Sequence, residues 1–135
     1  MVEIALPKRI MVADDDPVFR EIAATCLRKA GYATRLASQG ADAMTMLLRE
    51  HFDLAIVDLL MPQIDGLRLI ALIRATPQLR DLPILVITSR QDPAVRAEGM
   101  QVGADNYLTK PVDWSRLPCQ IEALIAECAA KNEAA

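Results

Sequence analysis

Short apolar runs alternate with longer stretches of helical periodicity along the chain. The apolar runs cover residues 9–13, 34–37, 54–57, 84–87 and 106–108. This alternation is typical of βα units that stack on a parallel sheet, and the first, third and fourth runs are nearly all aliphatic, as strands covered on both faces are. The pattern therefore predicts an α/β fold, a doubly wound sandwich around a single five-stranded parallel sheet.

The second apolar run is the most polar of the five, which favours an edge position. Of the two common strand orders of doubly wound sheets, 2-1-3-4-5 places the second strand at an edge. We therefore predict this order, while the pattern itself leaves other orders open.

Start and stop signals define the predicted helices. Asp16 is expected to cap the first helix, Pro17 to occupy its first position and Gly31 to follow its end. We expect the last helix to begin near Ser115, because Pro118 is tolerated only in a first turn. The predicted helices cover about 17–30, 40–50, 66–75, 93–102 and the residues from 115 onward.

Composition narrows the class of protein. With 135 residues the chain is expected to form one domain, residues 1–135, with its core over about 8–130. A net charge of -3 and 4% aromatic residues argue against nucleic-acid binding. No run approaches the roughly 18 apolar residues of a membrane span, and we recognise no secretory signal. Cys26, Cys119 and Cys128 are interpreted as small buried apolar residues, so we expect a cytoplasmic protein.

Polar side chains follow the predicted strands where ligands bind in open parallel sheets, beyond the carboxyl ends. Asp14, Asp15 and Asp16 follow the first strand, and Asp58 follows the third. Close carboxylates repel each other by about 4 kcal/mol per pair at an effective dielectric constant near 20, so a hard divalent cation is expected among them. Thr88 and Lys110, after the fourth and fifth strands, would add a hydroxyl and an ammonium, a combination that indicates phosphoryl chemistry.

Four segments carry a resemblance to a known family. They are IMVADDDP at 10–17, DLAIVD at 53–58 followed by Met61-Pro62 and Asp65-Gly66, LVITS at 85–89, and GADNYLTKP at 103–111. In this order and spacing they resemble the receiver domain of two-component response regulators. The resemblance spans residue 10 to the last helix and implies a flavodoxin-like (βα)5 three-layer sandwich with the same strand order.

The resemblance implies a role for each residue of the acidic site. Asp58 corresponds to the phosphoacceptor, which takes a phosphoryl group from a sensor histidine kinase or phosphotransfer protein. Asp15 corresponds to the direct ligand of Mg²⁺, with Mn²⁺ as an alternative, and Asp14 acts through water. Asp58 and the backbone carbonyl of Leu60 complete the protein ligands, and Lys110 clamps the phosphoryl oxygens.

The resemblance also implies a switch. Thr88 corresponds to the hydroxyl that moves to the aspartyl phosphate, and Tyr107 to the aromatic that follows it inward, although a tyrosine there could also simply pack. Their movement reshapes the surface of the fourth helix, fifth strand and last helix, which a downstream target or output domain reads and which supports a phosphorylation-dependent homodimer. Leu60 and Arg90 occupy positions that tune phosphoryl lifetime. The Lys110-Pro111 bond resembles the family's cis peptide.

The sequence also fits other interpretations of the acidic residues. An Asp-x-Asp after the first strand suits a haloacid-dehalogenase-type phosphohydrolase, with Asp14 as nucleophile and Asp16 as general acid. A receiver would instead be no turnover enzyme but a signalling domain that catalyses its own phosphorylation and dephosphorylation. Asp16 is more simply explained as a helix cap, and His51 as a surface residue distant from the site. The sequence fits a free-standing domain as well as part of a longer regulator or hybrid kinase.

Overall fold

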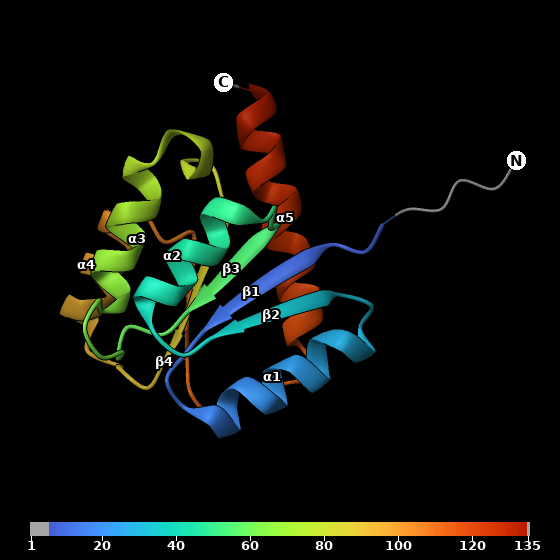
Figure 1. The fold of residues 1–135 in the computed structure, drawn as a ribbon, viewed down its shortest axis with the longest axis horizontal. Coiled ribbons are helices and arrows are strands. Elements are labelled where there is room, and N and C mark those ends of the chain that lie inside the picture. The colour runs from blue at the N-terminus through green and yellow to red at the C-terminus, as the bar shows by residue number, and fades with distance from the viewer. Residues whose placement is uncertain (1–5, 135) are drawn as a thin grey trace, which may run out of the picture.

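The computed structural model describes residues 6–134, which form five βα units (Figure 1). Strands and helices follow one another as predicted, with one short 3-10 helix, η1, before the fourth strand. The elements are β1 (Arg9–Ala13), α1 (Pro17–Lys29), β2 (Ala33–Ala37), α2 (Gly40–Arg49), β3 (Leu54–Val57), α3 (Gly66–Ala75), η1 (Pro77–Leu79), β4 (Ile84–Thr88), α4 (Pro93–Val102), β5 (Asn106–Thr109) and α5 (Leu117–Ala134).

All strand pairs in the sheet are parallel, and their order is β2-β1-β3-β4-β5. The predicted order is therefore confirmed, with the polar strand β2 at one edge. Helices α1 and α5 cover one face of the sheet and α2, α3 and α4 the other (Figure 1). The fold is the predicted flavodoxin-like three-layer sandwich.

Two hydrophobic cores lie on opposite faces of the sheet. In β1, Ile10 and Val12 pack toward α1 and α5, whereas Met11 and Ala13 pack toward the other helices. Successive side chains of a strand point to opposite faces, so a strand covered on both sides must be apolar at every position. This explains why the central strands are aliphatic throughout.

Helix caps set the entry of the chain into its helices. Asp16 accepts a hydrogen bond from the Val18 N–H, Pro17 is the first residue of α1, and Gly31 follows the end of α1 with φ 95°. These three predictions are confirmed. Helix α5 begins at Leu117 and not near Ser115, because residues 114–116 form a turn; Pro118 does lie in the first turn.

The cysteine prediction was only partly right. Cys128 is buried in the core under α5, but Cys26 is half-buried and Cys119 is exposed. Cys119 lies on the side of α5 that faces away from the sheet, and a helix turns such a position to solvent regardless of residue type. Among residues 6–134, none of the helices combines the length and hydropathy that a membrane crossing requires.

Candidate functional site

Backbone hydrogen bonds hold the candidate site residues at the carboxyl ends of the strands. The Asp14 N–H donates to the Ala37 carbonyl, and the Asp58 N–H donates to the Ala13 carbonyl, both at 3.0 Å. Across the sheet, the Lys110 N–H donates to the Thr88 carbonyl at 2.8 Å. Each residue thus extends the hydrogen-bond pattern of neighbouring strands, so the main chain sets the spacing of the site.

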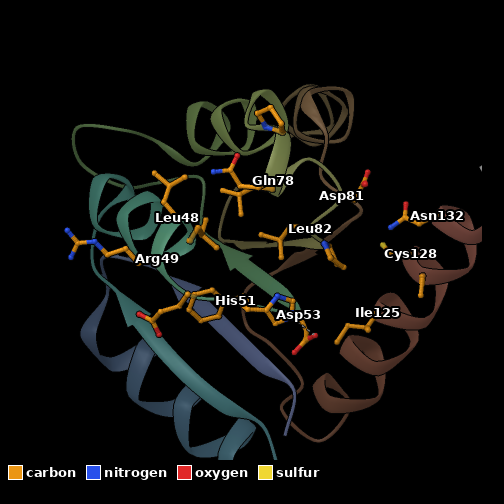
Figure 2. A pocket seen from close by; sticks show the side chains of 17 residues that line it. Leu48, Arg49, His51, Asp53, Gln78, Asp81, Leu82, Ile125, Cys128 and Asn132 are labelled. Carbon is orange, nitrogen blue, oxygen red and sulfur yellow. Dashed lines mark hydrogen bonds and ion pairs between the residues drawn. The ribbon is translucent and has the colours of Figure 1, made fainter. Parts of the chain in front are cut away.

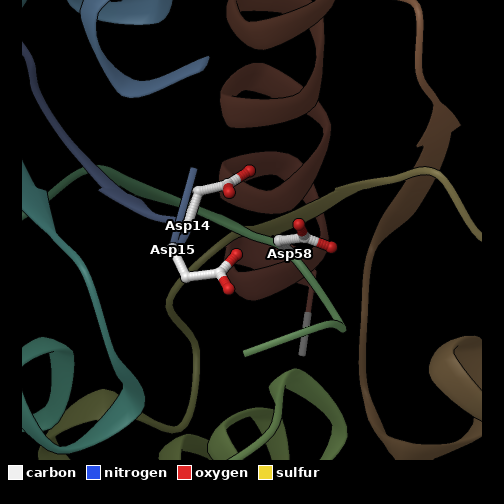
Figure 3. A group of neighbouring side chains, drawn as sticks. All are labelled: Asp14, Asp15 and Asp58. Atoms are coloured by element: carbon white, nitrogen blue, oxygen red, sulfur yellow. The ribbon is translucent and has the colours of Figure 1, made fainter. Parts of the chain in front are cut away.

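Three carboxylates converge at this end of the sheet (Figure 3). One oxygen from each of Asp14, Asp15 and Asp58 lies within 4.8 Å of the others. Asp14 and Asp58 are 1% and 4% exposed, whereas Asp15 is exposed. Asp16 lies outside this group, because its carboxylate caps α1, as predicted. The sequence therefore identified the acidic cluster and separated it from the helix cap.

Lys110 is the cation that faces the buried acids. Its Nζ lies 2.8 Å from Asp14 Oδ2 and 3.2 Å from Asp58 Oδ2. Burial acts to lower the pKa of Lys110, but its bond to Asp14 and the charge of Asp58 outweigh it and raise the pKa above its ordinary value. Burial raises the pKa of Asp14, against the opposing effect of the Lys110 hydrogen bond. The Lys110 ammonium therefore stays charged at neutral pH.

The donor set fits a hard divalent cation. Three carboxylates face a single ammonium, so the cluster keeps an excess of negative charge in a partly buried place. Within residues 6–134, the other hydrogen bonds to these carboxylates come from backbone amides alone, from the Asp16 N–H to Asp14 Oδ1 and from the Leu60 N–H to Asp58 Oδ1. Carboxylate oxygens with access to water are the ligands that Mg²⁺ prefers.

Thr88 and Tyr107 lie on β4 and β5, the two strands that follow β3 in the sheet. Thr88 is fully buried, and its hydroxyl accepts the Arg90 N–H at 3.4 Å. Tyr107 is 3% exposed, and its hydroxyl donates to the Arg90 carbonyl at 2.8 Å. The Arg96 guanidinium covers the ring at 5.6 Å from its centroid. Tyr107 is thus held inward, and burial raises the pKa of its hydroxyl.

Three contacts around the site were not predicted from the sequence. The Lys110 Nζ lies over the Phe19 ring, 4.2 Å from its centroid. The Arg20 guanidinium donates to the Asp14 carbonyl at 2.7 Å. Gly66, the first residue of α3, lies directly against the backbone after β3. Only Gly66 had a sequence signal, as part of the Asp65-Gly66 motif; Phe19 had the pattern of an ordinary core residue.

A groove of about 510 Å³ lies at the opposite end of the sheet, bordered by the end of α2, by η1 and by α5 (Figure 2). His51 lines this groove, and its side chain is 81% exposed and 3.3 Å from Asp53 Oδ1. His51 therefore lies at the surface, as predicted, because it precedes β3 whereas the acidic cluster follows the strands.

Comparison with known families adds the decisive observation. Residues 10–122 match the response regulator receiver domain. The chain belongs to this family. A receiver domain is a signalling module and not an enzyme with a separate turnover substrate, so the assignment rejects the phosphohydrolase alternative. The structure agrees with the family assignment, since Asp16, the general acid of that alternative, caps α1 and lies outside the group of Asp14, Asp15 and Asp58.

Relatives agree with this receiver domain in sequence and fold. It is 39% identical over 117 residues to the response regulator MprA of Mycobacterium leprae, covering 87% of this chain and 50% of MprA. It thus spans about half the length of that relative. The chemotaxis protein CheY4 of Vibrio cholerae superposes with a TM-score of 0.83 at 28% identity, covering 87% of this chain and 98% of CheY4.

A third relative bears on the metal. The receiver domain of the sensor histidine kinase PA1611 from Pseudomonas aeruginosa superposes with a TM-score of 0.83 at 28% identity, over 89% of this chain and 98% of the other. That structure has a magnesium ion coordinated in its active-site cleft. The present receiver domain carries an acidic triad, Asp14, Asp15 and Asp58, that suits a magnesium-binding phosphoacceptor site.

Proposed function

We propose that Asp58 accepts a phosphoryl group from a sensor histidine kinase or a phosphotransfer protein. The observation that carries this proposal is the convergence of Asp14, Asp15 and Asp58 within 4.8 Å, with Lys110 3.2 Å from Asp58. A carboxylate nucleophile, an acidic metal site and a fixed cation are the components that phosphoryl transfer to a protein side chain requires.

The metal is Mg²⁺, with Mn²⁺ as a substitute. Asp15, Asp58 and the backbone carbonyl of Leu60 would hold it directly, and Asp14 through water. Asp15 is the exposed member of the triad, which suits a ligand that shares the ion with solvent. When bound, the metal would supply positive charge that reduces the repulsion between the Asp58 carboxylate and the incoming phosphoryl group.

Asp58 acts as the nucleophile in this mechanism. One of its oxygens forms the bond to phosphorus as the bond from phosphorus to the donor imidazole nitrogen breaks, and the electron pair of that bond stays on the nitrogen. The Lys110 ammonium, already 3.2 Å from Asp58 Oδ2, donates to a phosphoryl oxygen and stabilises the developing charge. The Leu60 N–H orients Asp58 through Oδ1.

Phosphorylation is then read through β4 and β5. The Thr88 hydroxyl moves to a phosphoryl oxygen, and Tyr107, which already lies inward, is retained there and holds the surface of α4, β5 and α5 in its active shape. The backbone of Arg90 links Thr88 to Tyr107, because its N–H donates to the Thr88 hydroxyl and its carbonyl accepts the Tyr107 hydroxyl. Leu60, 43% exposed, and the exposed Arg90 border the access of water to Asp58 and set the phosphoryl lifetime.

The surface of α4, β5 and α5 presents the signal to a downstream target or output domain, or to a second copy in a phosphorylation-dependent homodimer. Residues 1–135 act as one receiver domain in the cytoplasm, where its kinase would meet it. The net charge of -3 supports protein partners over nucleic acid for this domain.

Intact-mass measurement and peptide mapping after incubation with Mg²⁺ and acetyl phosphate test the proposal. We expect the added mass of one phosphoryl group on the peptide that contains Asp58, and none when Mg²⁺ is chelated. Asp58→Asn should abolish the label while circular dichroism stays unchanged. A label on Asp14 instead would contradict the proposal and support the hydrolase chemistry.

A further inference from the structure

Lys110 contacts the ring of Phe19, and Phe19 in turn contacts the ring of Trp114. Phe19 of α1 is 7% exposed, and the Lys110 Nζ lies 4.2 Å from its ring centroid. The Phe19 ring also packs against Trp114, with centroids 5.3 Å apart and an interplanar angle of 46°. Trp114 lies just before α5 and packs against the same core as Phe19. The segment after β5 therefore contacts the site lysine through α1.

We propose that Phe19 is a positioning residue for Lys110, and that Trp114 fixes the Phe19 ring in the required place. This inference rests on the proposed function of Asp58. A cation is attracted to the face of an aromatic ring within about 6 Å of the centroid, and more strongly where water is partly excluded. The Lys110 side chain is only 21% exposed, so it meets that condition.

The Phe19 ring gives Lys110 a contact for which a bound metal would not compete. Lys110 now contacts Asp14 Oδ2 and Asp58 Oδ2, and both carboxylates belong to the acidic triad. Hard divalent cations bind oxygen and not aromatic faces. Phe19 therefore keeps the ammonium near Asp58 when its carboxylate partners turn toward a metal, and the lysine does not need to be repositioned for transfer.

The chain offers a matched control in its other phenylalanine. Phe52 is 6% exposed and also lies under a cation, since the Arg9 guanidinium is 5.1 Å from its ring centroid. Phe52 lies two residues before the start of β3, at the opposite end of the sheet from the acidic triad. Phe19→Leu and Phe52→Leu thus each remove a ring of similar burial that contacts a cation. Of these two rings, that of Phe19 contacts the site lysine, Lys110, and that of Phe52 does not.

The experiment measures the rate of Asp58 labelling by acetyl phosphate and Mg²⁺ in the full 135-residue chain. We expect Phe19→Leu and Phe19→Met to reduce the maximal rate by about threefold to tenfold, the range of one partly buried cation–π contact. Phe52→Leu should keep the wild-type rate, and Phe19→Tyr, which retains the ring, should restore most of it. The Mg²⁺ concentration for half-maximal rate should stay within about twofold, because Phe19 supplies no oxygen ligand to the metal.

A second measurement needs neither metal nor phosphodonor. Reductive methylation of Lys110, followed by peptide mass in chelator, should be faster in Phe19→Leu than in wild type and unchanged in Phe52→Leu, because the ring covers one side of the amine. If Phe19→Leu fails to fold by circular dichroism, Trp114→Leu replaces it. That variant leaves Phe19 in place without its support and should show the same two changes in weaker form, with Trp114→Phe as its ring-retaining control.

The outcomes separate the inference from the proposed function. Equal labelling and methylation rates in folded Phe19→Leu and Phe52→Leu would overturn the positioning role while leaving Asp58 as phosphoacceptor. A wild-type chain that Mg²⁺ and acetyl phosphate do not label would instead refute the proposed function itself. Loss of rate in Phe19→Tyr to the level of Phe19→Leu would also overturn the inference, since the ring would then be irrelevant.

Discussion

Gly66 touches the backbone of Asp58. A Cβ atom at Gly66 would overlap the Asp58 carbonyl oxygen and lie 2.6 Å from Leu59 Cα. The first turn of α3 therefore lies as close to the end of β3 as two backbones allow. The requirement for glycine here comes from this close approach, and it couples α3 to the position of the proposed phosphoacceptor.

Gly66→Ala should therefore affect both stability and labelling. We expect the free energy of unfolding to fall by about 1–3 kcal/mol, the usual cost of forcing an extra carbon into a packed site, and Asp58 labelling to slow as the backbone shifts. Urea unfolding and the labelling assay measure the two effects.

Gly99 is the matched control for that substitution. It lies inside α4, and a Cβ there would be 3.6 Å from Tyr107 Cε2, an ordinary contact. Gly99→Ala should raise the free energy of unfolding by about 0.5–1 kcal/mol, because alanine favours a helix interior. Equal destabilisation by both substitutions would show that close approach is not the reason for Gly66.

Asp14→Asn should stabilise the metal-free protein. Asp14 is buried beside Asp58, and its removal relieves one charge from a cluster of three carboxylates and one ammonium. We expect a gain on the order of 1 kcal/mol, roughly 3 °C in melting temperature, in the presence of chelator. Mg²⁺ should raise the melting temperature of the wild type more than that of the variant.

Asp15→Asn is the comparison for this prediction. Asp15 is exposed, so its neutralisation should change metal-free stability little while weakening the response to Mg²⁺. A wild-type melting temperature that does not respond to Mg²⁺ would contradict the assignment of the triad as a metal site.

Asp113 should make stability depend on pH in the acid range. Its carboxylate accepts the Ser115 hydroxyl at 2.6 Å and the Ser115 N–H at 3.1 Å, and the hydroxyl bond is the main reason that its pKa lies below the ordinary value of 3.8. The unfolded chain therefore binds the proton more readily than the folded one. The contribution is present above pH 3.8 and is lost as the pH falls through the lower folded-state pKa.

Asp113→Ala should thus destabilise the protein most above pH 3.8, with the difference from wild type shrinking under more acid conditions. Chemical unfolding of both proteins over a pH series measures this difference. Asp42→Ala, which removes an acid from the first turn of α2, serves as a comparison for general charge effects. A difference that stays constant through the acid range would rule out the linkage.

Tyr107→Phe should lower stability with little effect on phosphorylation by a small donor. The variant leaves the Arg90 carbonyl without the Tyr107 hydroxyl, and loss of one such bond costs about 0.5–1.5 kcal/mol. Tyr107 contacts neither Asp58 nor Lys110 by hydrogen bond, so the labelling rate should stay within about twofold. Tyr32→Phe, at the half-buried second tyrosine, should change neither; an equal loss of stability there would contradict the role of the Arg90 bond.

The sequence predicted those features that depend on local chemistry. Apolar runs predicted the ranges of β1 and β3, and a capping residue beside the start of the helix predicted the cap at Asp16. Polar residues directly after the strands predicted the acidic cluster. Each of these signals lies within a few neighbouring positions of the sequence. The start of α5 was placed about two residues early, because the Asp113–Ser115 hydrogen bonds stabilise a turn where helical periodicity already begins.

The contacts that escaped prediction join residues far apart in the chain. Phe19 lies under Lys110 because α1 and the end of β5 meet across the edge of the site, and its apolar spacing alone indicates only a core position. The exposure of Cys119 was not predicted from its residue type either, because the side of a helix that faces solvent depends on how the helix is rotated about its own axis.

The main-chain bonds from Asp14 to Ala37, from Asp58 to Ala13 and from Lys110 to Thr88 have a practical consequence. None of these bonds involves a side chain of the acidic triad. Replacing a carboxylate by an amide should therefore alter the charge at this end of the sheet and leave the backbone conformation unchanged. If a histidine kinase supplies the phosphoryl group, as proposed, a chain carrying Asp58→Asn should therefore still be recognised by that kinase, and would act as a decoy that occupies the kinase without transmitting a signal.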